Sequence, residues 1–268
     1  MPVYCPSQIE PISTDDFRKL DYVVMGHIFA SQNEIGRLAD ERVYQADIAE
    51  RLRSAGIASE IEVPICVAHK TFTTELSLDL VVECRAVYEL KTASALTSSH
   101  VAQLLTYQYL LDLPRGKLVN CRSAKVECQY VNAPIPRSDR CNFEVLDDRY
   151  DGGQELRAMV VDLIRDLGTS LSASLYQQAL VNMMGGEASV ERMLPLTRDA
   201  NPLANQRFRL VDEASALELT TFANSDGSYE AQLQRLLELS PLRVIHWINI
   251  ASHRISFCTV KRRSELKS

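Results

Sequence analysis

The stretches that decide the fold are Leu76-Ser77-Leu78-Asp79-Leu80-Val81-Val82 and, after four intervening residues, Val87-Tyr88-Glu89-Leu90-Lys91. Side chains two residues apart on a β-strand point to the same face. The leucines of the first stretch therefore share one face, and Asp79 takes the other. Glu89 and Lys91 likewise share a face of the second stretch. We predict two neighbouring strands that bring two carboxylates and one ammonium group together.

Charges buried in this way are costly unless they pair with each other or hold a metal ion. Two carboxylates suit a hard cation such as Mg²⁺, which takes oxygen ligands and keeps several waters. Lys91 would then orient or activate an attacking water and balance part of the negative charge. The alternative is that all three charges are solvated on edge strands, with Glu89 and Lys91 as an ordinary ion pair.

A third carboxylate comes from residues 39–54, which we predict to form a helix. Tyr44, Ile48 and Leu52 follow Glu41 at helical spacing, so Glu41 shares their apolar face. A carboxylate on a buried stripe needs a partner, which makes Glu41 a candidate for the same site. The alternative is a glutamate that stabilises the first turn through the helix dipole.

A further helix is predicted over residues 97–111, directly after the strand that carries Lys91. Thr97 and Ser98 provide an N-cap signal ahead of an apolar run. His100, Gln103 and Tyr107 fall at positions i, i+3 and i+7 and form one polar stripe. The stripe is either the solvated face of the helix or a second wall of the predicted site.

Residues of about 23–131 resemble the GxxExxY proteins, a branch of the PD-(D/E)xK nuclease superfamily. The resemblance is carried by Glu34-Ile35-Gly36, Glu41-Arg42-Val43-Tyr44, Leu78-Asp79-Leu80-Val81, Glu89-Leu90-Lys91, Leu96-Thr97 through His100, Gln103-Leu104-Leu105, Tyr107 and Leu118-Val119-Asn120. Two positions depart from the family pattern. Leu38 stands where a glycine precedes the motif glutamate, and Ser77 stands where an arginine often precedes the metal-binding aspartate.

The resemblance implies a restriction-endonuclease-like core, with a mixed sheet flanked by helices and a divalent metal, Mg²⁺ or Mn²⁺, at its edge. By this likeness Asp79 and Glu89 are metal ligands, helped by the main-chain carbonyl of Leu90. Lys91 positions the nucleophilic water. Glu41 touches a metal or its water.

Gln103 and Tyr107 resemble the QxxxY motif of RecB-type nucleases, which supports the active site and the nucleic-acid strand. We therefore expect a metal-dependent phosphodiesterase that cleaves nucleic acid, DNA more readily than RNA, through a metal-activated water. The alternative is a non-catalytic module that binds nucleic acid or protein on a nuclease fold, because a fold does not fix a function.

The composition sets limits on the class of protein. The chain has 268 residues, 46% of them hydrophobic, and seven cysteines without a C-x-x-C pair, so neither a disulfide framework nor a zinc knuckle is indicated. No apolar run reaches the length of a membrane span, and the amino terminus lacks the pattern of a signal peptide, so we expect a cytoplasmic protein without membrane contact.

The net charge of −6 counts against nucleic-acid binding, since such proteins usually carry a basic domain or stripe. The local basic clusters are Arg115, Lys117, Arg122 and Lys125 near one predicted strand, Arg137 with Arg140 in a predicted linker, and Lys261-Arg262-Arg263 near the end of the sequence. Each is interpreted more simply as a solvated surface than as a phosphate track.

The order of predicted elements divides the chain in two. Helices, strands, a helix and two more strands fill residues 1–136, which fits a layered α/β domain of the nuclease type. The proline-containing segment 133–139 reads as a linker. Residues 137–268 are predicted to be an α+β region of unassigned role, which could mediate a homodimer or bind a protein partner. In that region Trp247 and Asn249 are either a recognition pair or part of the core.

Overall fold

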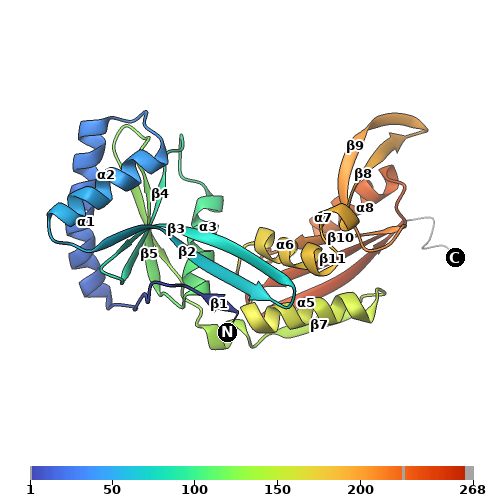
Figure 1. Ribbon diagram of the computed structural model, residues 1–268. Coiled ribbons are helices and arrows are strands. Elements are labelled where there is room, and N and C mark those ends of the chain that lie inside the picture. The colour runs from blue at the N-terminus through green and yellow to red at the C-terminus, as the bar shows by residue number, and fades with distance from the viewer. Residues whose placement is uncertain (1, 225–226, 263–268) are drawn as a thin grey trace. The chain divides into compact units, whose positions relative to one another are not determined.

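The computed structural model describes residues 2–224 and 227–262 (Figure 1). The chain separates into two compact units. The first unit contains residues 1–68 and 73–137, and the second contains residues 69–72 and 138–268. None of the helices among the described residues is long and apolar enough to cross a membrane.

A six-stranded mixed sheet forms the centre of the first unit. Its strands, in spatial order, are β1 (Val3–Tyr4), β2 (Ser59–His69), β3 (Phe72–Val82), β4 (Ala86–Lys91), β5 (Arg115–Asn120) and β6 (Glu127–Asn132). Strands β4 and β5 run parallel, whereas β3–β4 and β5–β6 are antiparallel pairs. Helix α3 (Ser98–Leu110) makes the crossover that a parallel pair requires. The predicted mixed α/β core with flanking helices is thus confirmed.

Helices α1 (Thr14–Ile35) and α2 (Glu41–Ser54) pack on one face of this sheet. The Ser13 side chain caps α1 by accepting a hydrogen bond from the Asp16 backbone amide at 3.1 Å. Gly36, at φ 83°, ends the helix in a conformation that favours glycine. The core between helices and sheet includes Phe17, Val24, Ile28, Tyr44, Ile48, Leu80, Tyr88 and Leu90.

The opposite face of the sheet carries α3. Leu104 of this helix lies close to Gly116 on β5, where an added Cβ would approach the leucine side chain to 3.2 Å. Because helices cover both faces, the central strands are almost fully buried, and β4 is buried from Ala86 to Leu90. The charged side chains of β4 therefore lie inside the domain and not on an edge strand.

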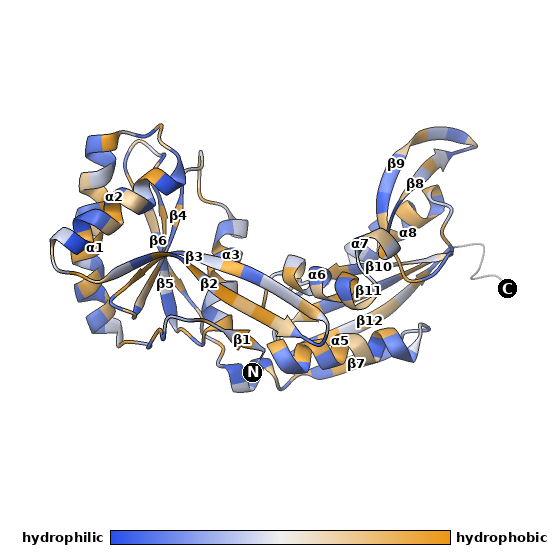
Figure 2. Cartoon of the chain, viewed as in Figure 1, coloured by the Kyte–Doolittle hydropathy of each residue, from blue (hydrophilic) through white to orange (hydrophobic). Residues whose placement is uncertain are grey.

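The second unit has its own six-stranded mixed sheet. In spatial order its strands are β7 (Glu144–Arg149), β12 (Arg254–Lys261), β11 (Val244–Ala251), β10 (Ser215–Thr220), β9 (Asn201–Leu210) and β8 (Glu191–Arg198). The accompanying helices are α5 (Gln154–Leu167), α6 (Ala173–Met183), α7 (Glu187–Val190) and α8 (Gly227–Leu239), with the short α4 (Arg137–Arg140) at the unit's start. In Figure 2, α5 alternates between polar and apolar residues along its length.

Trp247 and Asn249 belong to the interior of the second unit. The Trp247 indole donates to Thr220 Oγ1 at 2.9 Å. Asn249 Oδ1 accepts from the Thr220 hydroxyl and from the Phe222 amide, both at 2.8 Å. Since Asn249 Nδ2 also donates to the Phe222 carbonyl, the asparagine side chain is used within the fold. Of the two interpretations of Trp247 and Asn249, the structure supports the one in which both residues are part of the core.

The solvated interpretation of the basic clusters is wrong at two positions. Arg140 is fully buried, and its guanidinium donates to the carbonyls of Leu167 and Thr169. Lys117 is buried on the α1 side of the first sheet, where its Nζ lies 2.6 Å from Asp21 Oδ2. These two cations stabilise the fold, because each is enclosed and paired with acceptors.

Candidate active site

Strands β3 and β4 bring Asp79 and Glu89 together. The two strands pair Leu80 with Tyr88 and Val82 with Ala86, so the same register sets Asp79 opposite Glu89. The Leu90 backbone amide donates to Asp79 Oδ2 at 2.7 Å. Asp79 is 7% exposed and Glu89 is inaccessible to solvent. Two carboxylates thus lie side by side in the interior, as the period-two pattern predicted.

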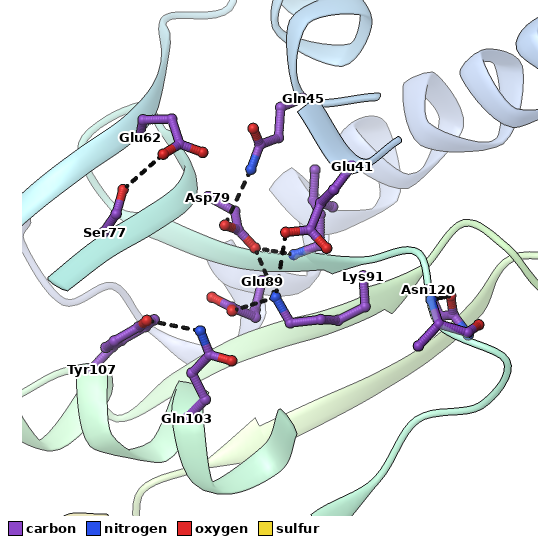
Figure 3. A network of polar contacts seen from close by, with 12 residues as sticks. Glu41, Gln45, Glu62, Ser77, Asp79, Glu89, Lys91, Gln103, Tyr107 and Asn120 are labelled. Atoms are coloured by element: carbon purple, nitrogen blue, oxygen red, sulfur yellow. Dashed lines mark hydrogen bonds and ion pairs between the residues drawn. The ribbon is translucent and has the colours of Figure 1, made fainter. Parts of the chain in front are cut away.

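Lys91 supplies the positive charge of this cluster (Figure 3). Its Nζ lies 2.7 Å from Glu89 Oε1 and 3.4 Å from Asp79 Oδ2. It also lies 3.6 Å from Glu41 Oε1. Three carboxylates therefore share one ammonium group, which leaves a surplus of negative charge when all of them are ionised.

Helix α2 contributes two side chains, one turn apart on the same face. Glu41 stands in the first turn and turns its carboxylate toward Lys91. Gln45, which is 2% exposed, donates from Nε2 to Asp79 Oδ1 at 3.1 Å. The sequence interpretation included Glu41 and missed Gln45, whose partner Asp79 lies 34 residues away in the sequence.

Helix α3 places Gln103 and Tyr107 on the other side of the cluster (Figure 3). Gln103 Nε2 donates to the Tyr107 hydroxyl at 2.8 Å. Tyr107 is 6% exposed, and burial raises the pKa of its hydroxyl to about 12. His100, the third member of the predicted stripe, accepts a hydrogen bond from the Thr97 amide and so caps the helix. Two residues of the predicted stripe, Gln103 and Tyr107, therefore lie at the site, while His100 serves the start of the helix.

Asn120 is a buried residue that the sequence interpretation did not assign to the site. It is the β5 neighbour of Lys91. Its side chain accepts from the Ala93 amide at 3.2 Å and donates to the Ala93 carbonyl at 2.9 Å. It also accepts from the Arg122 amide at 3.1 Å. Asn120 thereby fixes the chain directly after Lys91.

The two departures from the family pattern have clear places in the fold. Ser77 donates to Glu62 Oε2 at 3.3 Å, and Glu62 has a positive φ of 52° within β2. A non-glycine residue in this conformation is uncommon within a strand and marks a local irregularity. Leu38 is 86% exposed in the turn between α1 and α2. Neither position disturbs the cluster around Lys91.

Burial dominates the electrostatics of the cluster. It raises the pKa of the Glu89, Asp79 and Glu41 carboxyls above their ordinary values, and in each case the nearby Lys91 offsets part of the effect. For Lys91 itself, burial lowers the pKa. The charges of Glu89 and Asp79 outweigh burial and hold the pKa above the ordinary value.

The donor set of the cluster suits a hard divalent ion. The Glu89 carboxylate is buried and short of donors among the described residues: Oε1 meets only the Lys91 ammonium, at 2.7 Å, and Oε2 has no hydrogen bond. Such a group is costly in the interior. Within residues 2–224 and 227–262, no three His, Cys, Asp or Glu side chains are arranged to hold an ion. Mg²⁺ needs only one or two carboxylates with waters, so Asp79 and Glu89 satisfy its requirement.

A mixed sheet between helices, with an Asp, Glu and Lys cluster on adjacent strands, defines a nuclease-type α/β domain. Residues 18–131 match the family model described as the PD-(D/E)XK nuclease superfamily, so this region is a domain of that superfamily. No curated protein and no solved structure matches the chain. The predicted superfamily is confirmed, while the GxxExxY branch stays a prediction. The superfamily acts on nucleic acid and generally uses divalent metals.

Proposed function

We propose that the first unit is a metal-dependent nuclease that cleaves phosphodiester bonds in DNA more readily than in RNA. One observation carries this proposal: Asp79, Glu89 and Lys91 converge in the interior, and Glu89 Oε2 is buried there without a hydrogen bond. A merely structural ion-pair cluster would satisfy its buried oxygens.

Asp79 and Glu89, with the main-chain carbonyl of Leu90, are the residues that would hold Mg²⁺ or Mn²⁺. When bound, the ion polarises the scissile phosphate and lowers the pKa of a bound water. Lys91 orients the attacking water through the donor that its neighbours leave open. An ammonium has three donors. Glu89 and Asp79 lie 2.7 and 3.4 Å from Nζ, whereas Glu41, at 3.6 Å, is beyond hydrogen-bond distance.

Glu41 and the α3 pair complete the proposed machinery. Glu41 approaches the same ammonium from helix α2 and can accept a hydrogen bond from metal-bound water. Gln103 and Tyr107 are linked to each other and support the nucleic-acid strand beside the cluster. Their amide and hydroxyl groups suit phosphate and sugar oxygens, which are common acceptors in protein–nucleic acid contacts.

The test is a cleavage assay of purified protein on linear, circular and single-stranded DNA and on RNA, with Mg²⁺, Mn²⁺ or a chelator. Lys91→Ala and Asp79→Asn are assayed in parallel, with Lys19→Ala as the matched control, because Lys19 is exposed at the surface of α1. We expect cleavage by wild type and the control, and a loss of about a thousandfold or more in both site variants.

Circular dichroism and thermal melting confirm that the variants are folded. Cleavage by Lys91→Ala at the wild-type rate would overturn the proposal. Metal binding by wild type without cleavage of any substrate would also overturn it, in favour of a binding role on the same fold.

A further inference from the structure

Four cations flank the candidate active site on segments close to its carboxylates. They are Arg37 in the α1–α2 turn, Arg42 in the first turn of α2, and Arg122 and Lys125 in the β5–β6 turn. Arg37, Arg42 and Lys125 are exposed and Arg122 is partly buried. None of them forms an ion pair with another described residue. We call these four residues the cationic rim.

The β5–β6 turn is fixed close to the cluster. The Cys121 amide donates to the carbonyl of Lys91 at 2.8 Å, so Arg122 is the next residue beyond that contact. Gln32 of α1 donates from Nε2 to the carbonyls of Cys121 and Ser123, at 2.8 and 3.0 Å. With the Asn120 contact to the Arg122 amide, three residues therefore hold this turn in place.

The α1–α2 segment is fixed in the same region. The Tyr44 hydroxyl donates to the Gly36 carbonyl at 2.5 Å, which sets the start of the turn that carries Arg37. Arg42 directly follows Glu41, whose carboxylate lies 3.6 Å from Lys91 Nζ. Both arginines thus belong to a segment that ends at the cluster.

Three other cations of the first unit are paired with carboxylates. Lys117, on the strand that leads to Arg122, is buried against Asp21 and cannot reach a ligand. Arg51 and Arg53 of α2 pair with Glu34 and Glu50, respectively. The fold thus uses these three cations in pairs with carboxylates, whereas the four residues of the cationic rim have no ion pair among the described residues.

We propose that the cationic rim binds the backbone phosphates of a polynucleotide, DNA in the first instance, on the nucleotides next to the scissile bond. This inference rests on the proposed function, because it gives the substrate of the same site. The carboxylates around Lys91 repel a polyanion, and the whole chain is acidic at −6. Phosphate binding therefore needs local positive charge, and arginine presents a donor fork that matches phosphate oxygens.

If the cationic rim binds phosphates, large and small substrates should depend on it to different degrees. A phosphodiester without neighbouring phosphates, such as bis(p-nitrophenyl) phosphate, reaches the cluster without using the rim. A polynucleotide requires it for productive binding, since phosphate contacts set the position of the chain.

The experiment compares wild type with Arg122→Gln/Lys125→Gln and with the control Arg18→Gln/Lys19→Gln. The control removes the same charge from the exposed start of α1, where both cations pair with acidic neighbours. Binding of a labelled DNA duplex is followed by fluorescence anisotropy over a salt series, with Ca²⁺ as the divalent ion. Cleavage of bis(p-nitrophenyl) phosphate is measured with Mn²⁺, and thermal melting checks the fold.

We expect the rim variant to bind DNA about tenfold or more weakly, with a salt slope reduced by about 2 for the two lost contacts, and to cleave the small phosphodiester at the wild-type rate. Equal DNA affinity of the rim variant and the control would overturn the inference. If wild type cleaves nothing while the rim variant alone loses affinity, the proposed chemistry fails and the rim stands.

Discussion

Gln45 Nε2 donates a hydrogen bond to Asp79 Oδ1 at 3.1 Å, and both residues are almost completely buried. The second oxygen of Asp79 accepts from the Leu90 amide at 2.7 Å. The carboxylate is thus held at both ends, by a helix on one side and by the neighbouring strand on the other. Groups that orient a metal ligand in this way affect metal affinity without touching the substrate.

We predict that Gln45→Leu raises the metal concentration needed for half-maximal cleavage by about 10- to 100-fold. At saturating metal, most of the activity returns, because Asp79 itself is intact. The measurement is a titration of Mg²⁺ and Mn²⁺ against cleavage rate. Ala46→Leu, one residue away on the exposed side of α2, is the control. An unchanged metal requirement in Gln45→Leu would show that the hydrogen bond has no positioning role.

Glu89→Gln tests the stability cost of the acidic cluster. The substitution removes one buried negative charge from a group of three carboxylates around one ammonium, and Oε2 of this carboxylate has no hydrogen bond. We expect the free energy of unfolding in chelator to rise by about 1 kcal/mol, while cleavage is lost, since active sites commonly trade stability for function.

Chemical denaturation of wild type and Glu89→Gln in chelator measures this difference. Glu10→Gln, at an exposed position, should leave both stability and cleavage unchanged. A Glu89→Gln protein that is clearly less stable than wild type would mean that the ion pair with Lys91 outweighs the cost of burying the carboxylate.

The convergence of Asp79, Glu89 and Lys91 was predictable because it follows from the two-residue period of a strand. The short connection between β3 and β4 pairs the two strands in a register that places the three charges together. Glu41 was predictable from the helical spacing that it shares with Tyr44. These are local regularities of the backbone, and the sequence displays them directly.

Gln45 and Asn120 were not predicted because their roles depend on contacts between distant segments. Gln45 looks like one more polar residue of α2 until β3 is placed beside it. Asn120 becomes important only when β5 pairs in parallel with β4.

Removing one partner of the buried pair of Asp21 and Lys117 should strongly destabilise the first unit. Lys117 Nζ lies 2.6 Å from Asp21 Oδ2 and 4.1 Å from the centroid of the Tyr130 ring. The Tyr130 hydroxyl donates to the same oxygen of Asp21. Asp21→Ala leaves a buried ammonium without its counter-ion, so we expect a loss of about 3–5 kcal/mol in the free energy of unfolding.

Urea denaturation measures that loss. The double variant Asp21→Leu/Lys117→Met should recover most of it, because a buried ion pair is often replaceable by apolar residues of similar volume. If the double variant is as unstable as Asp21→Ala, the polar network contributes more than the pairing of two charges.

The same network predicts an alkaline transition. Burial lowers the pKa of Lys117, but Asp21 outweighs it and raises the pKa. The hydrogen bond to Asp21 raises the pKa of Tyr130, and burial with Asp21 raises that of Tyr88. The folded protein therefore retains protons that the unfolded chain releases from about pH 10 upward. Stability should be full below that pH and fall above it.

Urea denaturation from neutral to alkaline pH measures the effect. The slope above about pH 10 should be smaller in Asp21→Leu/Lys117→Met than in wild type, since the variant lacks both the lysine and the carboxylate that raises the tyrosine pKa values. Identical slopes in the two proteins would assign the alkaline loss to groups outside this network.

Tyr107→Phe tests whether the α3 pair acts on the nucleic-acid strand or on the cluster. The change removes the hydroxyl that accepts from Gln103 at 2.8 Å and keeps the buried ring. We expect kcat/KM for DNA to fall by about tenfold with an unchanged metal requirement, and cleavage of bis(p-nitrophenyl) phosphate to stay at the wild-type rate. If the pair acts as a unit, Gln103→Ala will cost little more in the Tyr107→Phe background. Equal losses on both substrates would instead mean that the pair acts through Asp79 and Glu89.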